Sequence, residues 1–434
     1  MDDSLTTVGD MMNEAGYYSA LKGKWHLGDA SIISGSGELT DLSGYGYADW
    51  GGTDYIGSVK EGNEMDPEIV SQAVEWMETT GKRLNEEGKP FFLDINLINP
   101  HDIMNYDVTG YESDFMQLSD KPDDPLYDTT YDVPIPSTWD FDFDAPGVPD
   151  ALRIFQSHWG LFAGVYHDAD VWQDYQNYYF NCIQDSDNNL MKILDYLTGN
   201  DMLDNTIVVF TADHGEMHGS HGLKGKGGHM YENNIHVPLI IVHPDYEGGK
   251  RVSAVTSHVD LAPTFVDMAN ISAEKKAEIT ADLPGKSLLP LMDGSQESVR
   301  DAALFCYEML SMTAVQYGKD ADGNTTYGFD VNARGMVRGI VTDQYKFVRY
   351  FSPVDFNTPT TLEELFAHND VQLFDLKADP DEMVNLAADP DANAELIAQL
   401  NDLLNETIAR EIGVDDGAYV MKVLKGLLEK SKAA

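Results

Sequence analysis

The chain has 434 residues, with 28 Lys and Arg against 74 Asp and Glu, which gives a formal net charge of −46. This charge excludes nucleic acids and anionic membrane surfaces as partners, because binding either one needs a strongly basic face and the basic residues are scattered. A hydrophobic content of 42% indicates a folded chain, so the acidity is not that of a disordered tail. Such a chain repels itself at low ionic strength, and we therefore expect a protein adapted to salt.

Two further exclusions follow from the residue types. The two cysteines, Cys182 and Cys306, are too few for a disulfide framework and are expected to be buried thiols. No run of 18 apolar residues occurs, so we expect no membrane span. Cellular location and oligomeric state stay unassigned at this stage.

The first elements in chain order end near polar loops. A short helix is predicted from Leu5 to Ala15, with no strand before it. A second helix is predicted to begin at Asp66 and Pro67, which have the residue types of an N-cap and a first helical position, and to stop at Gly81. A compact apolar run over 91–96 predicts a buried strand that leads into Asn99, Pro100 and His101.

The middle of the chain alternates strands and helices after an irregular stretch. Residues 102–150 show no period, and we interpret them either as an excursion that shapes substrate choice or as an acidic solvated loop. A long helix over 171–197, strands over 206–211 and 238–242 and a helix over 259–269 follow. This alternation predicts an α/β fold, with a mainly parallel sheet sandwiched by helices. Ligands of such sheets collect at the carboxyl ends of the strands.

The pattern changes near residue 300. A hairpin over 336–351, a strand over 372–376 and a helix over 392–411 indicate a smaller α+β unit. We place a catalytic domain at 1–300 and a C-terminal α+β subdomain at 301–434.

Three segments of the first domain carry the candidate functional residues. Lys24 and His26 stand two residues apart among glycines, His101 follows a strand, and Asp213 and His214 follow another strand and lead into a Gly-rich loop with Lys226. Asp and His side by side suit a divalent cation, while glycines and a lysine suit an anion. Lysines in such loops are out of character with a chain of this charge and suggest a local anion site.

Each residue taken singly also has a structural interpretation. A lone His26 or His101 is more often structural than catalytic, and Gly-rich loops with one Lys are common turns. The series His218, His221 and His229 fits loop decoration or an adventitious metal site as well as a direct role. The functional interpretation depends on convergence, because three separate segments each offer Lys or His.

The motifs resemble the formylglycine-dependent sulfatases of the alkaline phosphatase superfamily. The resemblance lies in residues 16–28 (GYYSALKGKWHLG), 211–216 (TADHGE), 224–227 (KGKG), 230–232 (MYE), 237–241 (VPLII) and 373–376 (LFDL). It covers nearly the whole chain in the expected order and implies an alkaline-phosphatase-like fold. Gly228 and His229 depart from the Pro and Phe that often precede Met-Tyr-Glu in the family.

The resemblance also implies a role for each candidate residue. Asp213 and His214 would supply two ligands of a divalent cation, with Ca²⁺ expected and Mn²⁺ or Mg²⁺ as alternatives. Lys24 and Lys226 would hold the sulfate oxygens, His26 would support the nucleophile, and His101 would lie near the leaving group. Lys24, His26, His101 and Lys226 are thus the implied catalytic residues, and Lys24, His101 and Lys226 also bind substrate. The implied substrate is a sulfate ester of a small molecule or glycan.

The family's nucleophile is a Cys or Ser converted to formylglycine within Cys/Ser-x-Pro-x-Arg, upstream of the Lys24 segment, and no such pattern occurs in the printed sequence. We expect that the first strand, its two Asp ligands and the nucleophile are lost from this chain, which alone would be inactive. Two alternatives stay open: a hydrolase of phosphate or phosphonate esters from the same superfamily, and a non-catalytic anion-binding relative.

Overall fold

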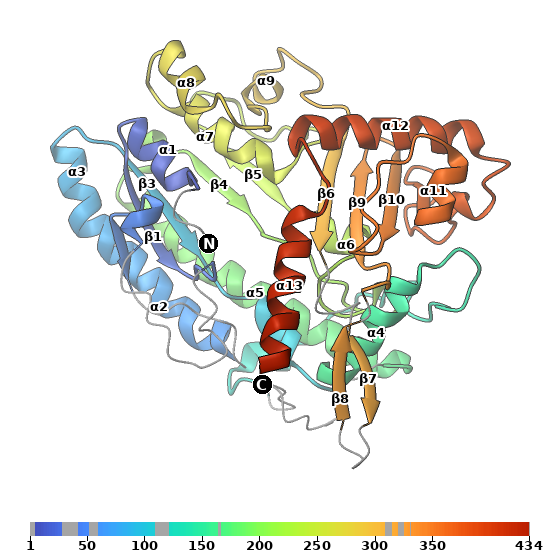
Figure 1. The fold of residues 1–434 in the computed structure, drawn as a ribbon. Helices are drawn as coiled ribbons and strands as arrows, with labels where there is room; N and C mark the ends of the chain where they lie inside the picture. The colour runs from blue at the N-terminus through green and yellow to red at the C-terminus, as the bar shows by residue number, and fades with distance from the viewer. Residues whose placement is uncertain are drawn as a thin grey trace.

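The structure is a computed structural model that describes residues 5–27, 42–51, 60–108, 121–163, 166–308, 315–319, 325–329 and 331–433. It has an α/β part followed by a smaller part built on an antiparallel sheet (Figure 1). The first part contains α1 (Val8–Glu14), β1 (Tyr18–Gly23), β2 (Asp49–Gly51), α2 (Glu61–Trp76), α3 (Lys82–Glu86), β3 (Phe91–Asn96), α4 (Asp150–Ala163), α5 (Ala169–Gly199), β4 (Val208–Thr211), α6 (Glu232–Ile235), β5 (Leu239–Val242), α7 (Leu261–Met268), α8 (Ala273–Ile279) and α9 (Leu289–Met292). The second part contains β6 (Ala303–Glu308), β7 (Val315–Lys319), β8 (Thr325–Phe329), β9 (Met336–Val341), β10 (Tyr345–Phe351), α11 (Leu362–His368), β11 (Asp370–Asp375), α12 (Ala394–Glu411) and α13 (Ala418–Ala433).

A parallel sheet positions the first half of the site. Strand β1 lies between β2 and β3 and runs parallel to both, with Gly23 opposite Asn96 at the carboxyl ends. Helices α2 and α5 cover this sheet through a cluster of buried apolar residues that includes Ala20, Val70 and Ile193. The predicted α/β class with a parallel sheet is confirmed.

Helix α2 differs from the predicted helix at both ends. It begins at Glu61, so Pro67 lies inside it and Asp66 is not its N-cap. The buried Asp66 carboxylate instead accepts hydrogen bonds from the backbone N–H groups of Ile98 (2.7 Å) and Asn99 (3.0 Å). Gly81 does not stop the helix, because a π-helical turn over Met77–Gly81 carries the chain into α3.

Two elements were missed in the prediction, and one strand was predicted with the wrong pairing. The prediction missed β1 and α4, and it expected β5 to join a mainly parallel sheet. Strand β5 instead runs antiparallel to β4. Among the described residues, β3 pairs with β1 alone and β4 with β5 alone, while Ile240 and Val242 of β5 are 56% and 50% exposed. The expectation that a strand is missing from the first sheet stays a prediction.

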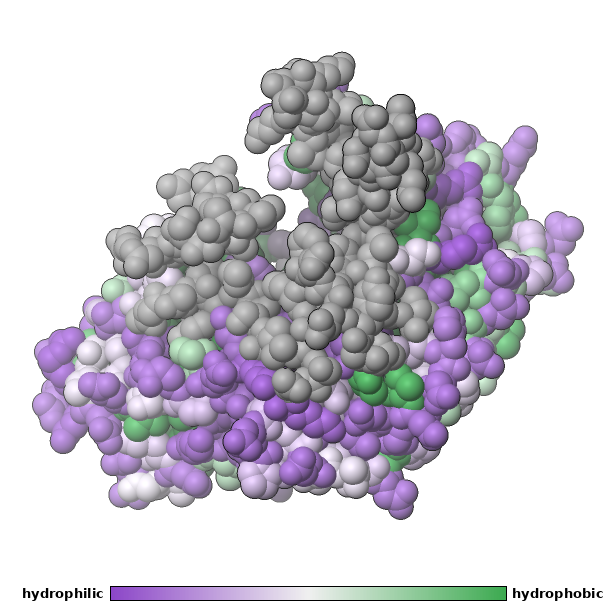
Figure 2. All heavy atoms as spheres, turned by 90° about the horizontal axis from the view of Figure 1, so that it is seen from below, coloured by the Kyte–Doolittle hydropathy of each residue, from purple (hydrophilic) through white to green (hydrophobic). Residues whose placement is uncertain are grey.

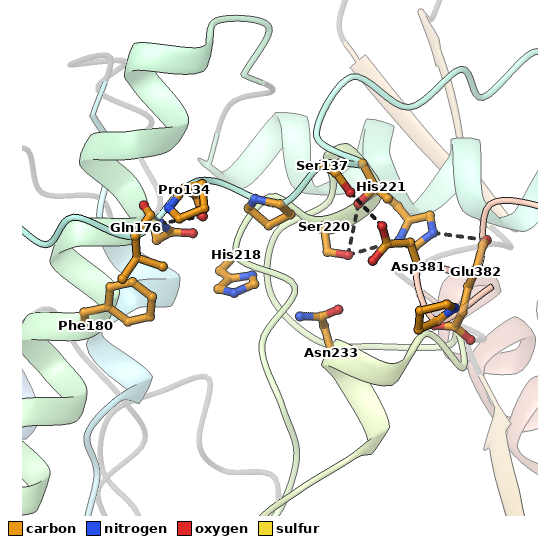
Figure 3. A pocket seen from close by; sticks show the side chains of 14 residues that line it. Pro134, Ser137, Gln176, Phe180, His218, Ser220, His221, Asn233, Asp381 and Glu382 are labelled. Atoms are coloured by element: carbon orange, nitrogen blue, oxygen red, sulfur yellow. Dashed lines mark hydrogen bonds between the residues drawn. The ribbon is translucent and has the colours of Figure 1, made fainter. Parts of the chain in front are cut away.

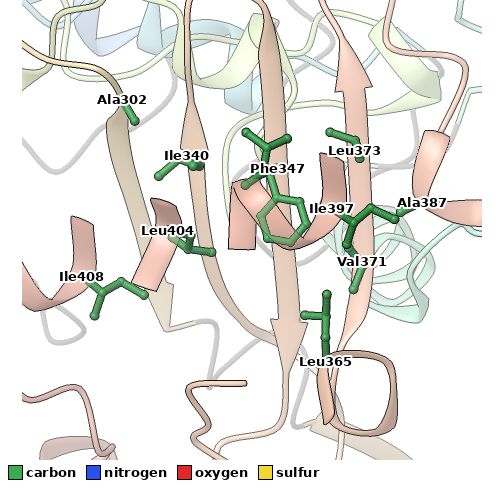
Figure 4. Packing of buried hydrophobic residues seen from close by; sticks show 11 residues of the cluster. Ala302, Ile340, Phe347, Leu365, Val371, Leu373, Ala387, Ile397, Leu404 and Ile408 are labelled. Carbon is green, nitrogen blue, oxygen red and sulfur yellow. The ribbon is translucent and has the colours of Figure 1, made fainter. Parts of the chain in front are cut away.

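The C-terminal part is a four-stranded antiparallel sheet in the order β11-β10-β9-β6. The predicted hairpin over 336–351 is confirmed as β9 and β10, and the predicted final helix as α12. Helix α12 covers one face of the sheet through buried side chains that include Phe347, Leu373 and Leu404 (Figure 4). The domain boundary at residue 300 stays a prediction.

Buried ion pairs connect the two parts. The Lys346 ammonium on β10 is fully buried and contacts the carboxylates of Glu382 (2.5 Å) and Glu232 (2.8 Å). Glu232 lies on α6, next to the Gly-rich loop of the candidate site. The C-terminal sheet therefore supports the segment that follows that loop.

The surface agrees with the composition. Among the coloured residues of Figure 2, hydrophilic side chains cover most of the visible surface, with apolar side chains between them. Within the described ranges, no helix combines the length and apolarity that a bilayer crossing requires. Cys182 is buried, Cys306 is partly buried, and both are free thiols.

Candidate active site

The first segment of the site leaves the carboxyl end of β1. Gly23 has φ +96°, and an added Cβ would lie 2.1 Å from the carbonyl oxygen of Asn96, so glycine is required at this close approach. The Lys24 N–H donates to the Asn96 carbonyl (3.1 Å), and the Asn96 side-chain amide donates to the Lys24 carbonyl (3.0 Å). His26 has φ +50°. Left-handed backbone at a non-glycine residue is typical of functional sites.

The second segment is the turn after β3 that carries His101. Asp66 holds the start of this turn, as described above. Asp102 holds its end, because its carboxylate accepts from the N–H groups of Gly62 (2.9 Å) and Asn63 (3.2 Å) at the start of α2. The His101 backbone is thus fixed from both sides against one helix.

His101 lies where the predicted site residues meet. Burial is the main reason that the pKa of its imidazole falls to about 2, and the charges of Lys24, Lys226, His214 and His26 contribute to the same shift. Its Nε2 atom is buried and has no hydrogen-bond partner within the described part of the chain. Lys24, His26, His101, His214 and Lys226, which come from three separate segments, therefore act on one another electrostatically. We call this group the cationic cluster, after its two lysines.

Asp213 and His214 follow β4 and fit two ligands of a divalent cation. His214 Nδ1–H donates to the Gly215 carbonyl (2.8 Å), which leaves the lone pair of Nε2 for a ligand. That Nε2 lies 3.4 Å from Asp213 Oδ2, and the Asp213 side chain is 87% exposed. No group of three or more His, Cys, Asp or Glu that could hold a metal occurs among the described residues, so the pair alone does not complete a coordination shell there.

Lys226 is held on a loop with its own internal supports. Burial lowers the pKa of Lys226, and the charges of Asp213 and Glu216 oppose that shift. Glu216 accepts hydrogen bonds from the N–H groups of Gly225 (2.7 Å) and His218 (3.2 Å). The loop is therefore closed on itself around a buried carboxylate.

Asn234 connects the start of the Gly-rich loop, at Gly215, to its end, at Gly227 and His229. Its side-chain amide donates to the carbonyls of Gly227 (3.0 Å) and His229 (2.6 Å), and its Oδ1 accepts from the Gly227 N–H (3.2 Å). Its own carbonyl accepts from the Gly215 N–H (2.8 Å). The sequence did not single out Asn234 or Glu216. Their place within or just after the two recognised motifs was the available signal.

The histidines of the series His218, His221 and His229 differ in their surroundings. His221 is buried, stacks on Tyr231 with ring centroids 3.7 Å apart, and has its pKa lowered to about 4 by burial. His229 is fully buried against Phe155. Both are buried packing residues, and His221 also lines a cavity together with His218, which is partly exposed. The three do not form a metal site within the described residues.

Comparison with known proteins decides the family. The family model for sulfatases matches residues 2–271, and the model for the C-terminal part of N-sulphoglucosamine sulphohydrolase matches residues 219–410. The chain belongs to the sulfatase family. The family resemblance inferred from the motifs is thereby confirmed.

Curated relatives and a solved structure agree with this assignment. The chain is 26% identical to an N-acetylglucosamine-6-O-sulfatase of Bacteroides thetaiotaomicron, over 94% of this chain and 74% of that protein. It is 30% identical to arylsulfatase K of Xenopus laevis, over 54% of this chain and 38% of that protein. A solved structure in complex with its substrate D-glucosamine-2-N,6-O-disulfate has the same fold, with a TM-score of 0.65, 21% identity and coverage of 96% of this chain and 85% of that chain. The relatives of this chain are thus sulfatase-type hydrolases. The chain spans only part of the length of these curated sulfatases.

Proposed function

We propose that this chain forms the larger part of an enzyme that hydrolyses sulfate monoesters, with water converting the ester to an alcohol and inorganic sulfate. The observation that carries the proposal is the cationic cluster around His101. Lys24 and Lys226 both act electrostatically on the buried imidazole of His101, so two lysines from separate loops face one place in a chain of net charge −46. A sulfate group is an anion that would suit this place.

Lys24 and Lys226 would hold the sulfate oxygens. Cleavage of a sulfate ester develops charge on the nonbridging oxygens and on the leaving oxygen, and fixed cations in a partly buried site stabilise that charge strongly. His101 is neutral at pH 7 because its pKa is low, so it would donate a hydrogen bond toward the leaving oxygen rather than a full charge. His26 would support the nucleophile.

Asp213 and His214 would hold a divalent cation, with Ca²⁺ expected and Mn²⁺ or Mg²⁺ as alternatives. When bound, such a cation polarises an oxygen of the ester. The oxygen of Asp213 suits any of the three, and the imidazole nitrogen of His214 makes the site less selective for Ca²⁺.

Turnover also requires a nucleophile, which the family forms as formylglycine. We propose that a longer chain, with Cys/Ser-x-Pro-x-Arg in frame ahead of Met1, supplies this residue and further metal ligands. We call that longer protein the complete chain. An in-frame motif in the DNA upstream of the Met1 codon supports this source, and an in-frame stop codon directly upstream favours a non-catalytic anion-binding protein.

The proposed substrate is a sulfated glycan residue. The curated relative from Bacteroides thetaiotaomicron is named for N-acetylglucosamine 6-sulfate, and the solved structure contains a sulfated glucosamine. A phosphate or phosphonate ester is the second candidate, because the motifs resemble a superfamily that also includes hydrolases of phosphorus esters.

Substitution of two site residues in the complete chain tests the proposal. Lys226→Ala or His101→Ala should lower kcat for an aryl sulfate by about 100-fold or more, the scale measured when one such donor is removed. The melting temperature should stay close to that of the unsubstituted protein. The matched control is Lys377→Ala, because Lys377 is an exposed lysine paired with Asp343 away from the site. Unchanged turnover in both site variants would contradict the assignment.

A further inference from the structure

A cavity of about 250 Å³ lies among segments that are far apart in the sequence (Figure 3). Its walls come from residues 133–138 of the irregular stretch, from Gln176 and Phe180 on α5, from the loop 218–221, from Asn233, and from residues 380–382 after β11. The volume is below the range of roughly 300–1,000 Å³ for sites that hold drug-sized ligands. It therefore suits one small ring rather than an extended chain.

Hydrogen bonds fix the walls of this cavity. The Gln176 side-chain amide donates to the carbonyls of Val133 (2.9 Å) and Pro134 (3.3 Å). The Ser137 hydroxyl donates to Asp381 Oδ2 (2.9 Å), which links the irregular stretch to the C-terminal part. The irregular stretch is thus tied down on two sides, which favours a role in shaping a site over that of a freely solvated loop.

The cavity lining contains hydroxyl and amide groups that can both donate and accept, and its exposed charged group is an acceptor. Asp381 is an exposed carboxylate, and no lysine or arginine is found among the described residues that line the cavity. His218 Nδ1–H donates to the Met217 carbonyl (2.6 Å), which leaves Nε2 as an acceptor. His218 also has φ +36°, a strained backbone that is typical of functional positions. Such a lining repels a sulfate group and attracts hydroxyl or ammonium donors.

The cavity adjoins the candidate active site through shared loops. His218 lies on the loop that begins with Asp213 and His214. Its backbone N–H and that of Gly225, the residue before Lys226, both donate to the Glu216 carboxylate. An added Cβ on Gly215 would lie 1.9 Å from the Asn233 carbonyl oxygen, so the two loops touch there. One end of this region is cationic and the other end is acidic.

We propose that this cavity is the subsite for the alcohol part of the ester, and that it binds one sugar residue with a protonated amino group facing Asp381. The proposal rests on the proposed function, because the cationic cluster takes the sulfate and leaves the acidic cavity for the sugar. The hydroxyl groups donate to His218 and Asp381, and the apolar face of the ring lies against Phe180 and the prolines of the wall.

Calorimetric titration of the chain with D-glucosamine and with D-glucose tests this subsite without needing turnover. The chain should bind glucosamine at least five-fold more tightly than glucose, and Asp381→Asn should abolish that preference. His218→Leu should weaken binding of both sugars, which provides a second variant should Asp381→Asn fail to fold. The matched control is Asp343→Asn, which neutralises another exposed carboxylate that does not line the cavity and should leave both affinities unchanged.

Two results would overturn the subsite: no glucosamine binding, or equal glucosamine binding by the chain and its Asp381→Asn variant. Lys226→Ala should not change glucosamine binding, so loss of binding in that variant would place the sugar in the cationic cluster and also overturn the proposal. Failure of the complete chain to hydrolyse sulfate esters would instead count against the proposed function, since the sugar titration is independent of turnover.

Discussion

His101 lies within electrostatic reach of both lysines of the candidate site. Its imidazole is buried among two lysines and two histidines, and its pKa falls to about 2. An anion bound between the lysines would offset their effect on His101. The proposed sulfate group would be such an anion.

At the same scale, His229 makes stability depend on pH. Both of its ring nitrogens are buried without hydrogen-bond partners in the described structure, and burial lowers its pKa to about 3, with His221 and Lys346 adding to the shift. Its pKa in the unfolded chain is about 6.5. The unfolded state thus binds the proton more readily, so stability is fully present above pH 6.5 and is lost as the pH falls from 6.5 toward 3.

His229→Phe should remove this dependence. Over pH 6 to 4 the free energy of unfolding should fall less steeply by about 1.4 kcal/mol per pH unit, the contribution of one titrating group. Denaturant unfolding at several pH values measures the slope, and His167→Phe is the control because His167 is exposed. An identical slope in the His229→Phe variant would show that His229 is protonated in the fold.

The candidate residues could be predicted because their signals are local. Lys24, His26, His101, Asp213, His214 and Lys226 all stand just after strands or in Gly-rich loops, and strand ends of an α/β fold converge. The roles of Glu216 and Asn234 could not be predicted, because each depends on which backbone groups the fold brings within reach. For the same reason, His218, His221 and His229 look alike in the sequence and have different surroundings in the structure.

Among the elements, the predictions succeed where the pattern is apolar and compact. Strand β3 has the predicted bounds, and α5 lies within two residues of its predicted ends. The start of α2 was predicted wrongly, because the carboxylate of Asp66 caps the distant turn at Ile98 and Asn99 instead of its own helix. Strand β1 was missed because its neighbours in the sheet, rather than its own pattern, define it.

Side-chain hydrogen bonds of Asn234 hold the Gly-rich loop of the candidate site. Asn234→Ala removes the hydrogen bonds to Gly227 and His229, and each buried group left unpaired costs about 1–3 kcal/mol. Amide hydrogen exchange over 215–229 should therefore speed up selectively, while exchange in the C-terminal sheet stays slow. Asn200→Ala is the control, since Asn200 is exposed at the end of α5. Unchanged exchange over 215–229 would mean that other contacts hold these loops.

For the whole molecule, the charge of −46 predicts a response to salt. The screening length falls from about 8 Å at physiological ionic strength to about 3 Å at 1 M, so repulsion among the surface carboxylates weakens. The melting temperature should rise between 0.1 and 1 M KCl and should rise less in a sorbitol solution of equal osmolarity. A melting temperature that does not depend on KCl would contradict adaptation to salt.

The rate ratio on matched aryl sulfate and aryl phosphonate substrates tests whether the cationic cluster serves sulfate ester hydrolysis. We predict that the complete chain hydrolyses the sulfate with the larger kcat/KM, and that Lys226→Ala lowers this value while Lys377→Ala does not. A larger kcat/KM for the phosphonate, or no hydrolysis of the sulfate by the complete chain, would contradict the account.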